Sequence, residues 1–301
     1  MPPKSISIKS SRRVLALSVG LFLFSIYLFS YRGGFHSVDE VAIYAVTESI
    51  AKLGRFNIDQ IAWIQWTTTQ AEAQGFFGQD GHVYSKKGLA LSLAQVSLYW
   101  LALHLPGIGM LQTVSLLNAL LTAVTGLLIF MFLHRLKFST FTAVTVTLIF
   151  GLATIAAVYA KYLFSEPLAG FLLLLAAYML FAYRQEGGLR HVAIAGLAAG
   201  FAVVTRANNL FILPVFGLYL IWGVWRQKRD SKSRFTFHVL RSIIPPLALF
   251  ILTVAIAGAV LMGYNAIRSG NSLNTGYDLT LFSPNVFLGL YKLLFSPLRG
   301  L

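Results

Sequence analysis

The sequence predicts an all-α fold, a multi-pass bundle of transmembrane helices with a large first outer loop that carries interfacial helices. Of the 301 residues, 57% are hydrophobic and only 11% are charged, whereas a soluble domain normally has about a quarter charged residues. Apolar runs recur along the chain at roughly the 17 to 25 residues that a helix needs to cross a bilayer. The basic residues gather in alternate loops. Together these observations favour a membrane bundle over a soluble fold.

The predicted membrane helices fall into two groups. Five runs are long enough to span the bilayer: Val14–Tyr31, Leu111–Leu133, Phe141–Tyr159, Pro167–Ala182 and Ser242–Tyr264. Two shorter runs, Val192–Val204 and Leu210–Trp225, are predicted to be half-length helices on either side of Thr205-Arg206. No small-residue cleavage site follows the first run, so it is interpreted as a true first helix and not a signal peptide. We therefore expect a cytoplasmic N-terminus over residues 1–13 and one membrane domain over 14–301.

The net charge of +14 is explained by membrane sidedness and does not indicate nucleic-acid binding. Fourteen of the 24 basic residues, but only two of the ten acidic residues, lie in four loops: Lys4 to Arg13, Arg135 to Lys137, Arg184 to Arg190 and Arg226 to Arg241. Basic residues accumulate in cytoplasmic loops. The pattern predicts a multi-pass protein of a bacterial plasma membrane (inner membrane), with its N-terminus in the cytoplasm.

This sidedness restricts the segment Leu89–Leu105. Residues 32–88 must then lie outside and the loop after Leu133 inside, so only one crossing fits between them. Leu89–Leu105 is shorter than Leu111–Leu133 and contains Ser92, Gln95 and Ser97. We expect it to be an interfacial or re-entrant helix on the outer side.

The outer loop 32–88 holds six of the ten acidic residues. It opens with Ser37-Val38-Asp39-Glu40, whose Ser-x-x-Glu spacing is a capping box and predicts a helix that ends near Gly54. The cap requires Glu40 but makes no demand on Asp39. From the residues alone, the pair is either a helix cap or part of a catalytic or ligand-binding site.

Two basic positions also have competing interpretations. Lys86 follows Gly81-His82-Val83-Tyr84-Ser85, a polar turn that is either a membrane-anchor flank or a phosphate-binding element. Arg206 lies between two apolar helices, where an arginine is costly unless it meets an anion or backbone carbonyls. The six histidines lack metal-ligand spacing, so a metal would need oxygen ligands, Asp39 or Glu40 together with Glu166.

These elements in this order resemble the GT-C superfamily of membrane glycosyltransferases, in particular the protein mannosyltransferase, aminoarabinose transferase and rhizobial lipopolysaccharide glycosyltransferase groups. The resemblance runs from Val14 to Leu301. Five elements carry it: Asp39-Glu40 with Ala42, Tyr44 and Ala45; Tyr84 to Gly88; Phe164 to Pro167; Ala195 to Arg206; and Tyr264 to Tyr277 followed by Leu294 to Gly300.

The chain departs from the family pattern in three ways. Lys87 stands where the subgroup often has an aromatic residue, so Lys86 is the preferred lysine. Glu166 stands where many relatives have Asp, which leaves a divalent metal ion as an open requirement with Asp39 and Glu166 as candidate ligands. Relatives also continue with further helices, so the chain is expected to be an N-terminal fragment.

The resemblance implies transfer of a sugar from a polyprenyl-phosphate-linked donor, with inversion, to a lipid, glycan or protein acceptor on the outer face of the membrane. It implies Asp39 as general base with support from Glu40, and Lys86, Arg206 and Arg268 as cations for the leaving phosphate. Glu166 would position the acceptor, a metal or a cation, and Lys161 is the nearest cation in sequence. The alternatives are a flippase or transporter of lipid-linked saccharides, which also needs cations and broken helices, and a non-catalytic scaffold.

Overall fold

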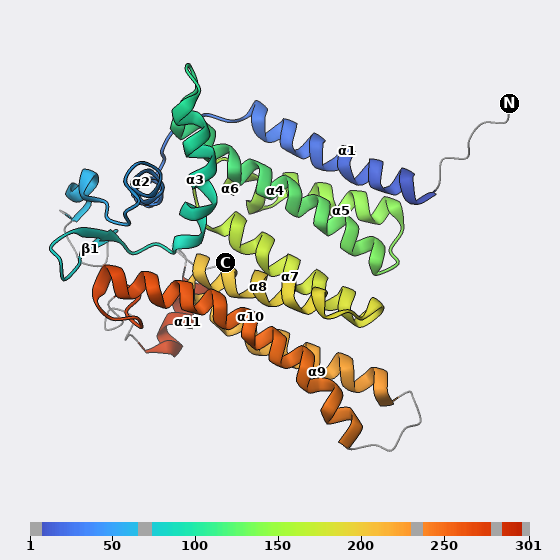
Figure 1. The fold of residues 1–301 in the computed structure, drawn as a ribbon. Coiled ribbons are helices and arrows are strands. Elements are labelled where there is room, and N and C mark those ends of the chain that lie inside the picture. The colour runs from blue at the N-terminus through green and yellow to red at the C-terminus, as the bar shows by residue number, and fades with distance from the viewer. Residues whose placement is uncertain (1–7, 66–73, 230–236, 278–284, 297–301) are drawn as a thin grey trace.

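The computed structural model describes residues 8–65, 74–229, 237–277 and 285–296, and these are almost entirely helical (Figure 1). In chain order the elements are α1 (Ile8–Phe29), α2 (Val38–Leu53), the 3-10 helix η1 (Asp59–Gln65), β1 (Gly75–Phe77), β2 (Val83–Ser85), α3 (Leu89–His104), α4 (Met110–Arg135), α5 (Thr140–Ala153), α6 (Ile155–Tyr159), α7 (Glu166–Glu186), α8 (Leu189–Thr205), η2 (Ala207–Ile212), α9 (Leu213–Arg229), α10 (Phe237–Ser269) and α11 (Val286–Phe295).

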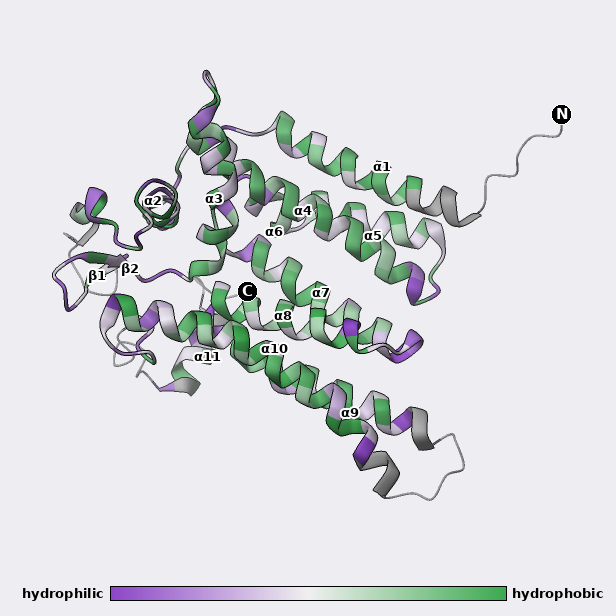
Figure 2. Ribbon diagram, viewed as in Figure 1, coloured by the Kyte–Doolittle hydropathy of each residue, from purple (hydrophilic) through white to green (hydrophobic). Residues whose placement is uncertain are grey.

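The long helices lie side by side in a bundle, and Figure 2 shows that they are hydrophobic along most of their length. Within the described ranges, four segments are long and apolar enough to cross a membrane: Met110–Arg135, Glu166–Glu186, Ala207–Arg226 and Arg241–Ser269. Shorter apolar helices, α1, α5 and α8, belong to the same bundle. The predicted class, an all-α bundle of membrane helices, is confirmed.

Small residues allow a close helix contact in the bundle, between α8 and α10. A Cβ added at Gly196 would lie 2.0 Å from Oγ1 of Thr253, and one at Gly200 would lie 2.6 Å from Cβ of Ala257. Four-residue spacing puts both glycines on one face of α8. The glycine-rich sequence of α8 therefore lets two backbones approach within a distance that any larger side chain would prevent.

Two predicted helix boundaries are wrong. The run Phe141–Tyr159 is broken between α5 and α6, because Thr154 is extended (φ −122°, ψ 175°) and its hydroxyl accepts a hydrogen bond from the Ala156 N–H at 3.2 Å, which starts a new helix. The run Leu210–Trp225 is not half-length, because η2 leads directly into α9 and the apolar segment extends over Ala207–Arg226.

Helices α2 and α3 lie crosswise to the bundle at one of its ends (Figure 1). The polar residues of α3 face α2: Ser92 Oγ donates to the Ile43 carbonyl at 3.0 Å, and Thr47 Oγ1 donates to Gln95 Oε1 at 3.0 Å. These bonds satisfy the hydroxyl groups of Ser92 and Thr47 and the amide oxygen of Gln95 inside the protein. The interfacial or re-entrant position of α3 stays a prediction.

A short antiparallel hairpin of β1 and β2, which the sequence analysis did not predict, leads into α3. Asp59 of η1 holds its second strand, because Oδ1 accepts the Val83 N–H at 2.8 Å and Oδ2 lies 2.6 Å from His82 Nδ1. The hairpin fixes the position at which the two consecutive lysines, Lys86 and Lys87, leave the strand.

Candidate active site

Glu40 is part of the helix cap that the sequence predicts, and it also makes a tertiary contact. Ser37 Oγ accepts the Glu40 N–H at 3.4 Å, and Glu40 Oε2 accepts the His36 N–H at 2.5 Å. The other oxygen, Oε1, accepts the Leu163 N–H at 3.1 Å, and the side chain is fully buried. Glu40 therefore joins the start of α2 to the segment that precedes α7.

Asp39, one residue earlier, pairs with a lysine from a distant part of the chain. Its Oδ2 lies 2.6 Å from Nζ of Lys87, and both side chains are partly exposed, 34% for Asp39 and 19% for Lys87. The turn after β2 orients the lysine, because Ser85 Oγ accepts the Lys87 N–H at 3.0 Å. The helix cap does not use Asp39, so this carboxylate can serve another purpose.

The lysine that contacts Asp39 is Lys87 and not Lys86, which was preferred from the sequence. The backbone N–H of Lys86 donates to the Gln74 carbonyl at 3.0 Å, which continues the pairing of the hairpin. Both lysines lie in the bend between β2 and α3, and it is the Lys87 side chain that reaches Asp39. The sequence carried little signal to distinguish the two lysines. The phosphate role of Lys86 stays a prediction.

A second ion pair joins Glu166 and Arg206. Arg206 Nη1 donates to Oε1 of Glu166, and the two side chains are 41% and 33% exposed. Glu166 begins α7, and Arg206 is an extended residue (φ −149°, ψ 119°) between α8 and η2. A cationic partner was one of three roles left open for Glu166 by the sequence, with Lys161 the nearest cation in sequence; in the structure the partner is Arg206.

The two ion pairs lie on elements that touch. A Cβ added at Gly88, the residue after Lys87, would lie 2.1 Å from the carbonyl oxygen of Thr205, the residue before Arg206. Only glycine allows such an approach of two backbones. With the Glu40–Leu163 contact, this brings together the start of α2, the turn after β2, the start of α7 and the end of α8.

Arg268, predicted to bind phosphate, is 2% exposed and engaged by the protein itself. Its guanidinium donates to the carbonyls of Ser85 at 2.7 Å and Thr275 at 2.9 Å and to Oδ1 of Asn265 at 2.6 Å. It also lies 4.4 Å from the ring centre of Tyr264. These contacts fix the end of β2, next to Lys87, against α10, and favour a positioning role.

The candidate metal ligands are each paired with a cation. Asp39 faces Lys87 and Glu166 faces Arg206. Over the described ranges, no three His, Asp or Glu side chains gather closely enough to hold a metal ion.

An apolar cavity of about 490 Å³ extends from Glu166 into the bundle. Its walls come from four helices, α4, α5, α6 and α7, and are formed mainly by Ile129, Phe150, Ile155, Phe171 and Leu174. Gly170 leaves part of the wall open, since a Cβ there would meet nothing within 4 Å. One charged side chain therefore lies at the edge of a space that suits an apolar chain.

The sequence profile of the dolichyl-phosphate-mannose-protein mannosyltransferases matches residues 87–266, more than half of the chain. The chain belongs to this family. The family is part of the GT-C superfamily of membrane glycosyltransferases, so the resemblance drawn from the sequence is confirmed. The matched region includes Lys87, Glu166 and Arg206, whereas Asp39 and Glu40 precede it. No curated protein sequence matches the chain significantly.

Proposed function

We propose that the chain transfers a sugar from a polyprenyl-phosphate-linked donor to a hydroxyl group of a lipid, glycan or protein acceptor. The Asp39–Lys87 pair, on elements that touch those carrying the Glu166–Arg206 pair, is the observation that carries this proposal. Acid and cation alternate over one small region at the end of a membrane bundle. That is the arrangement a displacement between a hydroxyl group and a sugar phosphate requires.

In the proposed step, Asp39 accepts the proton of the acceptor hydroxyl while the hydroxyl oxygen attacks the anomeric carbon of the sugar. The bond from that carbon to the phosphate oxygen breaks, the configuration inverts, and polyprenyl phosphate leaves. Lys87 orients the Asp39 carboxylate through its 2.6 Å contact. Glu40 supports the base indirectly, because it fixes the first turn of α2 on which Asp39 lies.

The leaving phosphate needs cations as negative charge develops on it. Lys87 and Arg206 lie on touching elements, and Lys86 leaves the same strand end. Glu166 holds Arg206 in place by pairing with it. The apolar cavity beside Glu166 provides room for the first part of the lipid tail.

The proposed location of this site is the outer face of a plasma membrane, with a cytoplasmic N-terminus. Of the seven acidic residues that the structure describes, six lie at or near the end of the bundle that carries α2 and α3. The loops at the opposite end are basic, as cytoplasmic loops are. The site would thus be reached from the compartment where the outer loop lies.

The test is a transfer assay with the full chain in liposomes, using labelled polyprenyl-phosphate mannose and a mixture of hydroxyl acceptors. We expect Asp39→Asn to reduce transfer by about 10² to 10⁴-fold, the usual contribution of a general base. The matched control is Glu48→Gln, a carboxylate on the same helix that pairs with Lys52, and it should remain near wild type. Labelled donor that crosses the bilayer without transfer by the wild type would instead support a flippase.

A further inference from the structure

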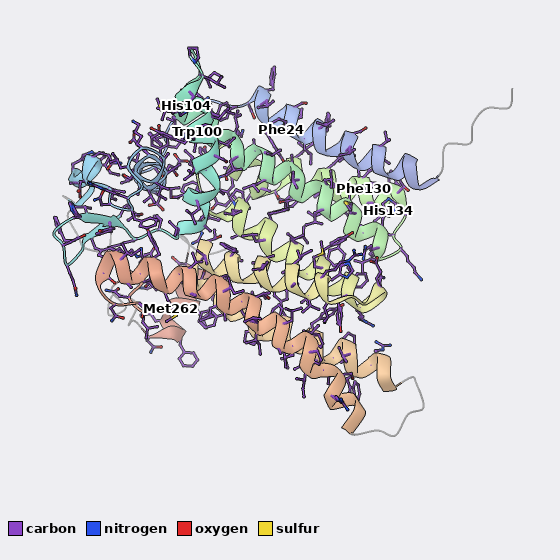
Figure 3. All side chains as sticks on the ribbon, in the orientation of Figure 1. Phe24, Trp100, His104, Phe130, His134 and Met262 are labelled. Carbon is purple, nitrogen blue, oxygen red and sulfur yellow. The ribbon has the colours of Figure 1, made fainter. Side chains whose placement is uncertain are left out.

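The end of the bundle opposite the ion pairs is strongly basic. At this end, the charged residues whose side chains the structure describes are six cations, Arg135, Lys137, Arg184, Arg190, Arg226 and Arg241, and a single acid, Glu186. Figure 2 shows hydrophilic patches at this end of α7 and α8, and in Figure 3 Phe130 and His134 mark the same end of α4. The predicted cytoplasmic position of these loops explains the excess of cations but not their arrangement in space.

Part of this charge lines a pocket of about 390 Å³ between three helices. The lining combines basic and apolar side chains, from α4 (Met131, Arg135), α7 (Tyr178, Met179, Ala182) and α8 (Arg190, His191, Ile194). Nothing in the proposed transfer reaction uses these residues.

The guanidinium of Arg135 is fixed in the pocket with one nitrogen left over. Its Nη2 lies 2.7 Å from Oε1 of Glu186, and the group lies 4.8 Å from the ring centre of Tyr178. Nη1 is buried and has no hydrogen-bond partner among the described residues. Buried donors are normally satisfied, so an oriented donor of this kind indicates an acceptor that binds beside it.

Arg190 adds a second cation at the exposed edge of the pocket, and no described acid pairs with it. Glu186 is already shared between Arg135 and His191, whose Nε2 lies 3.6 Å from the carboxylate. The pocket thus carries two arginines for one acid and an excess of positive charge. An anionic group complements both the charge and the unused donor.

The apolar part of the lining decides which anion fits. Met131 is 40% exposed and Ile194 is 39% exposed, and both lie beside the arginines on helices that are apolar along their length. A free phosphate ion would leave these apolar side chains uncovered, whereas the acyl chain of a lipid would cover them. Basic pockets between transmembrane helices are suited to anionic lipid headgroups.

We propose that this pocket binds an anionic phospholipid of the leaflet that it faces, with the lipid phosphate on Arg135 and Arg190 and an acyl chain along Met131 and Ile194. The lipid would hold α4 against the α7–α8 hairpin, far from the reacting groups. The site is independent of the proposed transfer reaction, since its ligand is neither donor nor acceptor.

The test is lipid binding by the full chain in detergent, measured by native mass spectrometry and by the rise in Tm. Phosphatidylglycerol should bind and raise the Tm, and phosphatidylcholine should not. Arg190→Gln should weaken phosphatidylglycerol binding about five- to tenfold, as expected for one cation near a headgroup. Arg190 is chosen because Arg135→Gln would also free Glu186 and could prevent folding.

The matched control is Arg226→Gln. Arg226 lies at the same end of the bundle but outside the pocket, with its guanidinium 5.5 Å from the ring centre of Trp222. Its loss should leave binding unchanged. Equal weakening by both variants would overturn the proposal in favour of diffuse attraction. Displacement of the lipid by millimolar inorganic phosphate, with the same dependence on Arg190, would overturn the lipid assignment in favour of a phosphate site.

Discussion

The two ends of the bundle use charge differently. At the end with α2 and α3, Asp39–Lys87 and Glu166–Arg206 pair residues 48 and 40 positions apart, so the fold itself assembles them. At the other end, cations outnumber the single described acid and follow directly from the loop sequence. Membrane sidedness can therefore be predicted from the charge pattern of the sequence. A site made of ion pairs between distant residues can be recognised only in the folded structure.

The largest expected effect comes from breaking one of the long-range pairs. Lys87→Gln removes the cation beside Asp39 and should lower transfer about 10²- to 10³-fold, similar to the loss of one transition-state donor. Lys86→Gln, at the adjacent position of the same strand end, should have a smaller effect. The measurement is kcat/KM for transfer by both variants. Equal losses, or a larger loss for Lys86→Gln, would contradict the assignment of Lys87.

Removing the clamp beneath the pair should cost stability. Arg268→Ala leaves the carbonyls of Ser85 and Thr275 and the side chain of Asn265 without their partner. Unsatisfied buried groups cost about 1 to 3 kcal/mol each, so we expect a loss of about 3 kcal/mol. Thermal unfolding in detergent checks this. A variant of unchanged stability that has lost donor binding would instead support the phosphate role of Arg268.

The contact between the elements that carry the two pairs can be tested at Gly88. The Cβ of Gly88→Ala would meet the Thr205 carbonyl, so the backbones must separate, at a cost of about 2 kcal/mol. Transfer should fall together with stability, because Lys87 and Arg206 move apart. Gly34→Ala is the control, since a Cβ at Gly34 meets nothing within 4 Å. If both variants behave alike, the close approach does not matter.

The smallest effect concerns Glu48, a carboxylate at the same end but outside the site. Burial raises its pKa, but hydrogen bonds from Lys52 and Tyr99 lower it more, so the folded pKa lies below the usual 4.5. The stabilisation linked to this lowered pKa is complete above pH 4.5 and is lost as the pH falls through the folded pKa. Unfolding measured between pH 3 and pH 7 should show this loss in the wild type and not in Glu48→Gln. The same pH dependence in both proteins would exclude Glu48 as its source.

Much of the fold could be predicted from the sequence, because its determinants are local. The lengths of the apolar runs predicted the helical bundle. The Ser37–Glu40 spacing predicted the start of α2, and Gly54, which is in the left-handed region at φ 63°, predicted its end. The break at Thr154 was not predicted, because the sequence of an apolar run does not show that a threonine hydroxyl within it will cap a new helix.

The candidate site could be predicted only in part. The sequence pointed to Asp39, Glu40, Glu166 and Arg206, but the pairing of Glu166 with Arg206 instead of Lys161 depends on where α8 ends. The choice of Lys87 over Lys86 depends on a hairpin of three-residue strands that carries little sequence signal. Arg268 is buried because it packs against Tyr264 of its own helix and against Ser85, which is far away in the sequence. The contact with Ser85 depends on the fold and could not be predicted.

The most direct test of the account separates donor binding from transfer in Asp39→Asn. Binding of labelled polyprenyl-phosphate mannose and single-turnover transfer are measured on the same preparation, with the Tm as a check on folding. The account predicts binding within a few-fold of wild type and a transfer rate lower by at least about 10²-fold. A transfer rate that stays at the wild-type level, or falls only in proportion to donor binding, would contradict Asp39 as the base.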